Sequence, residues 1–86
     1  MREKKVKLTD PHGMHMRPAG ILSNIAGSYE CDITLQTGGK EVNAKSIMMI
    51  MAAGIKSGSE INVVCEGRDE DKALDAVCSA IEGFDE

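Results

Sequence analysis

The spacing of apolar residues, every second residue in some segments and every third or fourth in others, most constrains how this chain of 86 residues folds. Segments in which every second residue is apolar predict strands at 5–9, 32–37 and 60–66, and a hairpin turn at Gly38-Gly39 predicts a fourth strand at 40–43. Apolar residues three and four positions apart predict helices at 16–26 and 69–83, and a capping Ser46 with Gly54 as the stop predicts a short helix at 46–53. The order β-α-β-β-α-β-α predicts an α+β two-layer sandwich, in which three helices cover one face of a four-stranded antiparallel sheet.

Five of the predicted elements, 5–9, 16–26, 32–37, 60–66 and 69–83, have one apolar face, and these faces identify the expected core. Gly38-Gly39 is typical of the tight turn of a hairpin between the second and third strands. No repeat, linker or low-complexity segment interrupts the pattern, so we expect one domain over residues 1–86. The side chains expected inside are Val6, Leu8, Ala19, Leu22, Ile25, Ala26, Ile33, Leu35, Ile61, Val63, Cys65, Leu74, Val77, Cys78 and Ile81.

The composition argues against several classes of function. A net charge of −4, a single Tyr, a single Phe and no Trp argue against nucleic-acid binding. No apolar run is long enough to cross a bilayer, and the basic start has no signal-peptide core, so we expect a cytoplasmic protein without membrane contact. Three cysteines without CxxC spacing predict buried, reduced thiols. We expect no metal and no cofactor.

Acidic residues are absent from two stretches, 11–29 and 42–59, whereas eight of them lie between 66 and 86. The acid-free stretches carry Arg17, Lys45 and Lys56. If the two stretches meet in space, they form a surface on which an anion meets little repulsion. Charge gaps of this length also arise by chance in short chains, so the pattern alone leaves both interpretations open.

The first predicted helix begins without a capping side chain, whereas a serine and an aspartate open the other two. Its start reads Met14-His15-Met16, followed by Arg17 and by Pro18, which fits a first turn because it has no N–H to satisfy. Unsatisfied first-turn amides and the helix dipole favour a phosphate, and Arg17 adds planar donors. A neutral His15 imidazole beside such donors can take up a phosphoryl group and release it to another nucleophile.

Two motifs, GMHMRPAG at 13–20 and KSIMMIMAAGIKSGSEI at 45–61, together resemble the HPr family of the bacterial phosphoenolpyruvate-dependent sugar phosphotransferase system. The resemblance covers essentially the whole chain and implies an open-faced sandwich. It implies that His15 accepts phosphate from phosphorylated enzyme I and passes it to sugar-specific IIA proteins. Arg17 and first-turn amides such as that of Met16 would support the phosphate. Such a carrier is a substrate of partner enzymes and not itself an enzyme.

The second motif contains five consecutive apolar residues, 47–51, which cover more than half the circumference of a helix. The pattern alone leaves open whether they belong to the core or to a surface. The resemblance implies an apolar docking patch for partner proteins, with Ile50 pointing inward. The residues expected in this docking patch are Gly20, Asn24, Gly27, Ile47, Met48 and Met51.

Ser46 has two compatible interpretations. It is a suitable N-cap for the second helix. The resemblance also implies a regulatory site, phosphorylated by an ATP-dependent serine kinase/phosphorylase, with a catabolite-control transcription factor as a further partner. A phosphate there would suit the helix dipole but would place negative charge beside the docking patch.

Two positions depart from the family pattern: Met16, where a small residue or threonine is common, and Met49, where glycine is common. His12 is a second imidazole without an adjacent arginine, so we expect His15 to be the acceptor. Two alternatives stay open. One is a regulatory paralogue that acts by binding partners, a type that often lacks the histidine, and the other is a carrier of a nitrogen-related phosphotransferase system. We expect a monomer.

Overall fold

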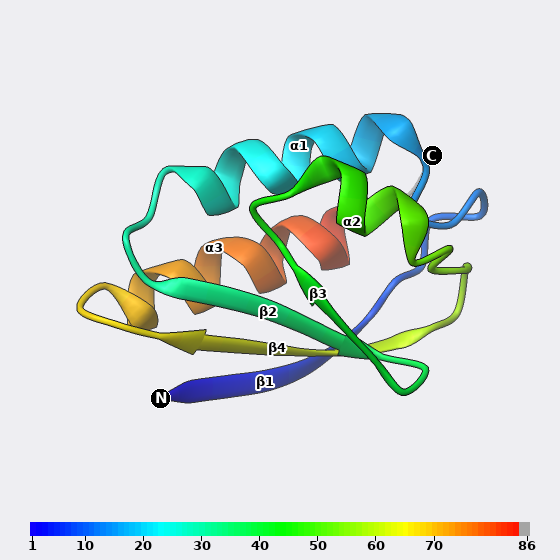
Figure 1. Ribbon diagram of the computed structural model, residues 1–86. Coiled ribbons are helices and arrows are strands. Elements are labelled where there is room, and N and C mark those ends of the chain that lie inside the picture. Colours follow the sequence, from blue (N-terminus) through cyan, green and yellow to red (C-terminus); the bar gives the residue numbers. More distant parts are fainter. Residues whose placement is uncertain (85–86) are drawn as a thin grey trace.

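The computed structural model describes residues 1–84, and the last two positions of the expected domain 1–86 lie outside the described residues. The sheet of this part consists of β1 (Arg2–Lys7), β2 (Asp32–Thr37), β3 (Lys40–Asn43) and β4 (Glu60–Glu66). The helices of the same part are α1 (Met16–Gly27), α2 (Ile47–Ala52) and α3 (Glu70–Gly83). All three lie on one face of the sheet (Figure 1), so the predicted α+β open-faced sandwich is confirmed.

The strands pair antiparallel in the order β1-β4-β2-β3. β4 is therefore central and pairs with both β1 and β2, although neither is its neighbour in the sequence. β2 and β3 form the predicted hairpin: Gly38 and Gly39 have φ of 57° and 77°, the left-handed conformation that a tight two-residue turn requires. α3 packs across β1 and β4, and α1 contacts both α2 and α3.

The core is the layer between the helices and the sheet. Every expected core residue is buried except Ile25, which is half-buried against its edge. The cysteines are buried and free, as predicted. Burial raises the pKa of Cys65 to about 12, because a thiolate loses its hydration there, and it raises the pKa of Cys31 and Cys78 as well.

The first strand differs from its prediction, 5–9, because β1 spans Arg2–Lys7. All six residues pair with β4, but within this strand only Val6 is buried. β1 lies at the edge of the sheet and is held by backbone hydrogen bonds to β4. Because most of its side chains are exposed, its sequence shows no apolar alternation over 2–5 from which the strand could be predicted. Leu8 leaves the regular ladder, although its N–H still donates to the Ser59 carbonyl oxygen at 2.9 Å.

The two predicted N-caps have different outcomes. Ser46 caps α2 as predicted, since its Oγ accepts the Met49 N–H at 3.2 Å. Asp69 stands at the N-cap position of α3, but its carboxylate makes no cap hydrogen bond within residues 1–84, so the capping prediction is wrong. It accepts the N–H groups of Glu30 and Cys31 at 2.9 and 3.0 Å instead, and ties α3 to the start of β2. These hydrogen bonds hold the pKa of Asp69 below its usual value, and the one from the Glu30 N–H has the largest effect.

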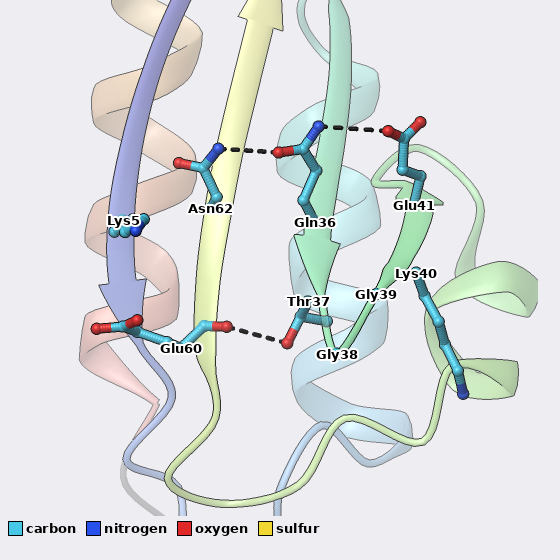
Figure 2. A pocket seen from close by; sticks show the side chains of 9 residues that line it. All are labelled: Lys5, Gln36, Thr37, Gly38, Gly39, Lys40, Glu41, Glu60 and Asn62. Carbon is cyan, nitrogen blue, oxygen red and sulfur yellow. Dashed lines mark hydrogen bonds between the residues drawn. The ribbon is translucent and has the colours of Figure 1, made fainter.

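The other face of the sheet is open and polar. Asn62 donates to Gln36 at 2.9 Å and Gln36 donates to Glu41 at 3.4 Å, so a row of hydrogen bonds crosses three strands (Figure 2). A hollow of about 470 Å³ runs along these residues and the β2–β3 turn. None of the described residues that line it is a histidine, and the candidate site lies on the helix side of the molecule.

Candidate functional site

His15 occupies the N-cap position of α1. Its backbone is extended, with φ −88° and ψ −171°, and its carbonyl oxygen accepts a helical hydrogen bond from Ala19 at 3.0 Å. Its side chain makes no cap hydrogen bond to the described residues, and no acidic residue stands in the first turn. The start of α1 therefore presents the positive end of the helix dipole without a neutralising group in that turn.

A tight backbone segment holds His15 against the loop that follows α2. Gly13 has φ 73°, and a Cβ there would lie 2.8 Å from the carbonyl oxygen of Ile55, so only glycine fits. Met14 is buried, and its N–H donates to that same oxygen at 2.9 Å. The same Cβ would lie 3.2 Å from the Cα of Lys56. The two acid-free stretches therefore do meet beside His15.

The three cations of those stretches do not gather at one place. Arg17 is exposed in the first turn of α1, two residues from His15. Lys45 instead donates from its Nζ to the Tyr29 carbonyl oxygen at 2.8 Å, just beyond the other end of α1. At about 1.5 Å per residue, the ends of this helix lie roughly 18 Å apart. Lys45 therefore supports the end of α1 that is remote from His15.

Asp10 is a member of the site that sequence analysis missed. It is 1% exposed and is the one buried charged residue in the described part of the chain. Its Oδ1 accepts the His12 N–H at 2.8 Å, and its Oδ2 lies 3.5 Å from Nε2 of His15. Asp10 continues the two-residue period of Val6 and Leu8, and this signal could have placed it on the inward face.

The two nitrogens of the His15 ring have different surroundings. Nε2 is buried beside Asp10 and has no hydrogen-bond partner among residues 1–84, although the side chain as a whole is 37% exposed. The exposed His12 ring meets His15 edge-on, with centroids 5.7 Å apart and planes at 87°. The exposed part of the His15 side chain therefore lies away from Nε2.

An exposed apolar surface lies on α2, next to α1. Ile47, Met48 and Met51 are 38%, 78% and 40% exposed, whereas Ile50 is fully buried, as predicted. Gly20 faces α2 directly, since a Cβ on it would lie 3.6 Å from Cδ1 of Ile47. The remaining residues expected in the docking patch, Asn24 and Gly27, are exposed one and two turns further along α1 than Gly20.

The two residues that depart from the family pattern are both exposed. Met16 is 69% exposed at the start of α1, and Met49 is 45% exposed on α2. No group of three His, Cys, Asp or Glu within residues 1–84 is arranged to hold a metal ion. No helix in that part of the chain combines the length and hydropathy needed to span a membrane.

Known proteins similar to this chain share both its sequence pattern and its fold. Residues 2–83 match the family described as the PTS HPr component phosphorylation site. The phosphocarrier protein HPr of Mycoplasma capricolum subsp. capricolum is 41% identical over 70 residues, 81% of this chain and 79% of that protein. The HPr-like protein Crh of Halalkalibacterium halodurans is 40% identical over 82 residues, 95% of this chain and 98% of that protein.

Solved structures extend this similarity. HPr from Thermoanaerobacter tengcongensis has a TM-score of 0.93 at 34% identity, covering 98% of this chain and 94% of that chain. An HPr dimer from the same organism has a TM-score of 0.77 at 36% identity, with both chains fully covered. The family match spans nearly the whole chain, and the two relatives named above are 41% and 40% identical to it. The chain belongs to the HPr family of the phosphotransferase system.

Proposed function

We propose that this chain is a phosphocarrier whose His15 takes a phosphoryl group from phosphorylated enzyme I and passes it to sugar-specific IIA proteins. The observation that carries the proposal is the uncapped start of α1, where a partly exposed imidazole stands at the N-cap position and Arg17 follows. The chain is then a substrate of its partners and not an enzyme. It acts in the cytoplasm as one domain over residues 1–86, as a monomer, and without a cofactor or metal.

The surroundings of the ring favour Nδ1 as the attacking nitrogen. Nε2 is buried against Asp10, which leaves Nδ1 as the nitrogen that a phosphoryl donor can reach. The Nδ1 lone pair forms the new N–P bond, while the bond from phosphorus to the donor breaks and leaves its electron pair on the donor. First-turn amides such as that of Met16 and the Arg17 guanidinium offset the charge of the phosphoryl oxygens.

Enzyme I and the IIA proteins bind in turn to the docking patch beside His15. A carrier must fit several partners and release each of them, so its surface has to adapt. The exposed methionines of α2 suit this demand, because methionine is flexible and polarizable. Gly20 keeps α1 and α2 close enough to present one continuous surface.

Ser46 makes the carrier subject to regulation. Phosphorylation by an ATP-dependent serine kinase/phosphorylase places negative charge next to Ile47, at the border of the docking patch. This charge repels acidic partner surfaces without a large change of fold, since a phosphate at a helix start suits the dipole. A catabolite-control transcription factor is the partner that this form would engage.

Two other functions use the same fold. The 40% identity to an HPr-like protein named Crh favours a regulatory paralogue as the second candidate. A carrier of a nitrogen-related phosphotransferase system is the third. Complementation of sugar uptake in a strain that lacks its own carrier separates them, since only a carrier of the sugar system restores growth on the transported sugar.

Intact-mass spectrometry after incubation with enzyme I and phosphoenolpyruvate tests the proposal directly. The wild-type chain is expected to gain a single acid-labile, base-stable phosphoryl group. His12→Ala is the matched control and should gain it too, whereas His15→Ala should gain none. Phosphorylation of His15→Ala under the same conditions would show that the acceptor is elsewhere.

A further inference from the structure

Asp10 is a buried carboxylate beside His15, and in the proposed phosphoryl transfer it has so far no role beyond covering Nε2. Its position is determined by the turn before α1: Oδ1 accepts the His12 N–H at 2.8 Å, and its carbonyl oxygen accepts the Gly13 N–H at 3.0 Å. The second carboxylate oxygen, Oδ2, is directed at Nε2 of His15, 3.5 Å away. A carboxylate is costly to bury, so its place beside a buried ring nitrogen calls for an explanation.

We propose that Asp10 is a positioning residue, which holds His15 in the tautomer with its proton on Nε2 and its lone pair on Nδ1. A neutral imidazole carries a proton on one nitrogen only. A lone pair on Nε2 would face the Asp10 oxygen and be repelled, whereas an N–H there is attracted. The separation exceeds an ordinary N–H···O distance by about 0.5 Å, which a small ring rotation closes, and such bonds often tighten during reaction.

This inference rests on the proposed phosphocarrier function, and it completes the proton balance of that scheme. Nε2 keeps its proton when Nδ1 forms the N–P bond, so the phosphorylated ring becomes cationic. The negative charge of the buried Asp10 carboxylate stabilises that positive charge. When the phosphoryl group leaves, its bonding electron pair returns to Nδ1 and the neutral ring is restored. No proton has to enter or leave the site in either direction.

Asp10→Asn tests this proposal sharply, because the turn decides how the new amide sits. The amide oxygen has to remain where Oδ1 is, in order to accept the His12 N–H. The NH₂ group then replaces Oδ2 and donates to Nε2, which puts the ring proton on Nδ1. Nitrogen NMR of the imidazole, recorded at about pH 8.5, reports the tautomer in the protein alone.

We expect the wild type to carry its proton on Nε2 and Asp10→Asn to carry it on Nδ1. Transfer of phosphate from enzyme I to the variant should be about 10- to 100-fold slower. Asp69→Asn is the matched control. It alters a different carboxylate, which accepts the N–H groups of Glu30 and Cys31, and it should change neither readout. An Asp10→Asn variant with its proton on Nε2 and the wild-type rate would overturn the proposal.

A second variant covers the case in which Asp10→Asn does not fold, as judged by its backbone amide spectrum. Asp10→Ser keeps a side-chain acceptor for the turn but leaves no charged oxygen facing Nε2. It should transfer phosphate more slowly than the wild type and show an increased population with the proton on Nδ1. If both readouts equal those of the wild type, Asp10 does not position the ring. If the wild type itself accepts no phosphate, the phosphocarrier proposal fails, whereas the tautomer measurement still decides the role of Asp10.

Discussion

Replacing Ser46 should separate its structural role from the effect of charge at the same position. α2 is only six residues long, Ile47–Ala52, and a helix of this length is not stable by itself. The Oγ of Ser46 accepts the Met49 N–H at 3.2 Å, one of the first-turn donors. Ser46→Ala removes this bond and is expected to lower the free energy of unfolding by about 1 kcal/mol. For a domain of this size, the loss corresponds to a Tm lower by about 4–8 °C.

Two further variants at Ser46 complete the test. Aspartate and asparagine are both good N-caps, so Ser46→Asp and Ser46→Asn should keep wild-type stability. Only the aspartate adds charge beside the docking patch, so only Ser46→Asp should weaken the binding of enzyme I. Urea unfolding followed by circular dichroism measures the first effect, and titration calorimetry measures the second. The reasoning is refuted if Ser46→Ala is as stable as the wild type, or if the aspartate and asparagine variants bind enzyme I equally well.

Three other features give measurable expectations. Ile50→Ala should lower the unfolding free energy by about 2–5 kcal/mol because it empties a fully buried site, while Met48→Ala, at a 78% exposed position, should change it by less than about 0.5 kcal/mol and weaken enzyme I binding. Equal stability losses in urea unfolding would contradict this. The pKa of Asp69 is lowered below 3.8 by the N–H of Glu30, so the stability it contributes is complete above that value and is lost as the pH falls through the folded pKa. Acid unfolding of Asp69→Asn should therefore be less steep than that of the wild type, and identical curves would argue against the bond. The Cys65 thiol, with its pKa raised to about 12 by burial, should resist iodoacetamide at about pH 8 until urea is added; prompt labelling of the folded chain would count against its burial.

The local pattern of the sequence was sufficient for most of the fold. β2 and β4 each bury one face, so their two-residue period was visible, and the glycines at 38–39 indicated the turn that joins β2 to β3. The cap at Ser46 was predictable because its donor lies only three residues away. The bounds of β1 were not predictable in this way, because an edge strand is held by backbone pairing and needs no apolar alternation.

Side chains with partners far along the chain could not be assigned from local patterns. Asp69 has the residue type and position of an N-cap, but its carboxylate contacts amides 38 and 39 positions earlier. Lys45 belongs to an acid-free stretch, but it contacts the carbonyl beyond the remote end of α1. In both cases the alternative partner becomes available only when the sheet and helices have packed, so propensity at the position itself does not identify it.

The sequence by itself determined that His15 stands at a helix start without a cap and that Arg17 follows it, because both facts depend on neighbouring residues alone. Only the tertiary structure decided which ring nitrogen faces the interior. That outcome depends on the inward alternation of Val6 and Leu8, which continues to Asp10 beyond the end of β1. It also depends on the turn that brings the Asp10 carboxylate to 3.5 Å from Nε2. The contact between Asp10 and His15 forms because the chain reverses its direction between them. The two-residue spacing of apolar side chains therefore does not predict it.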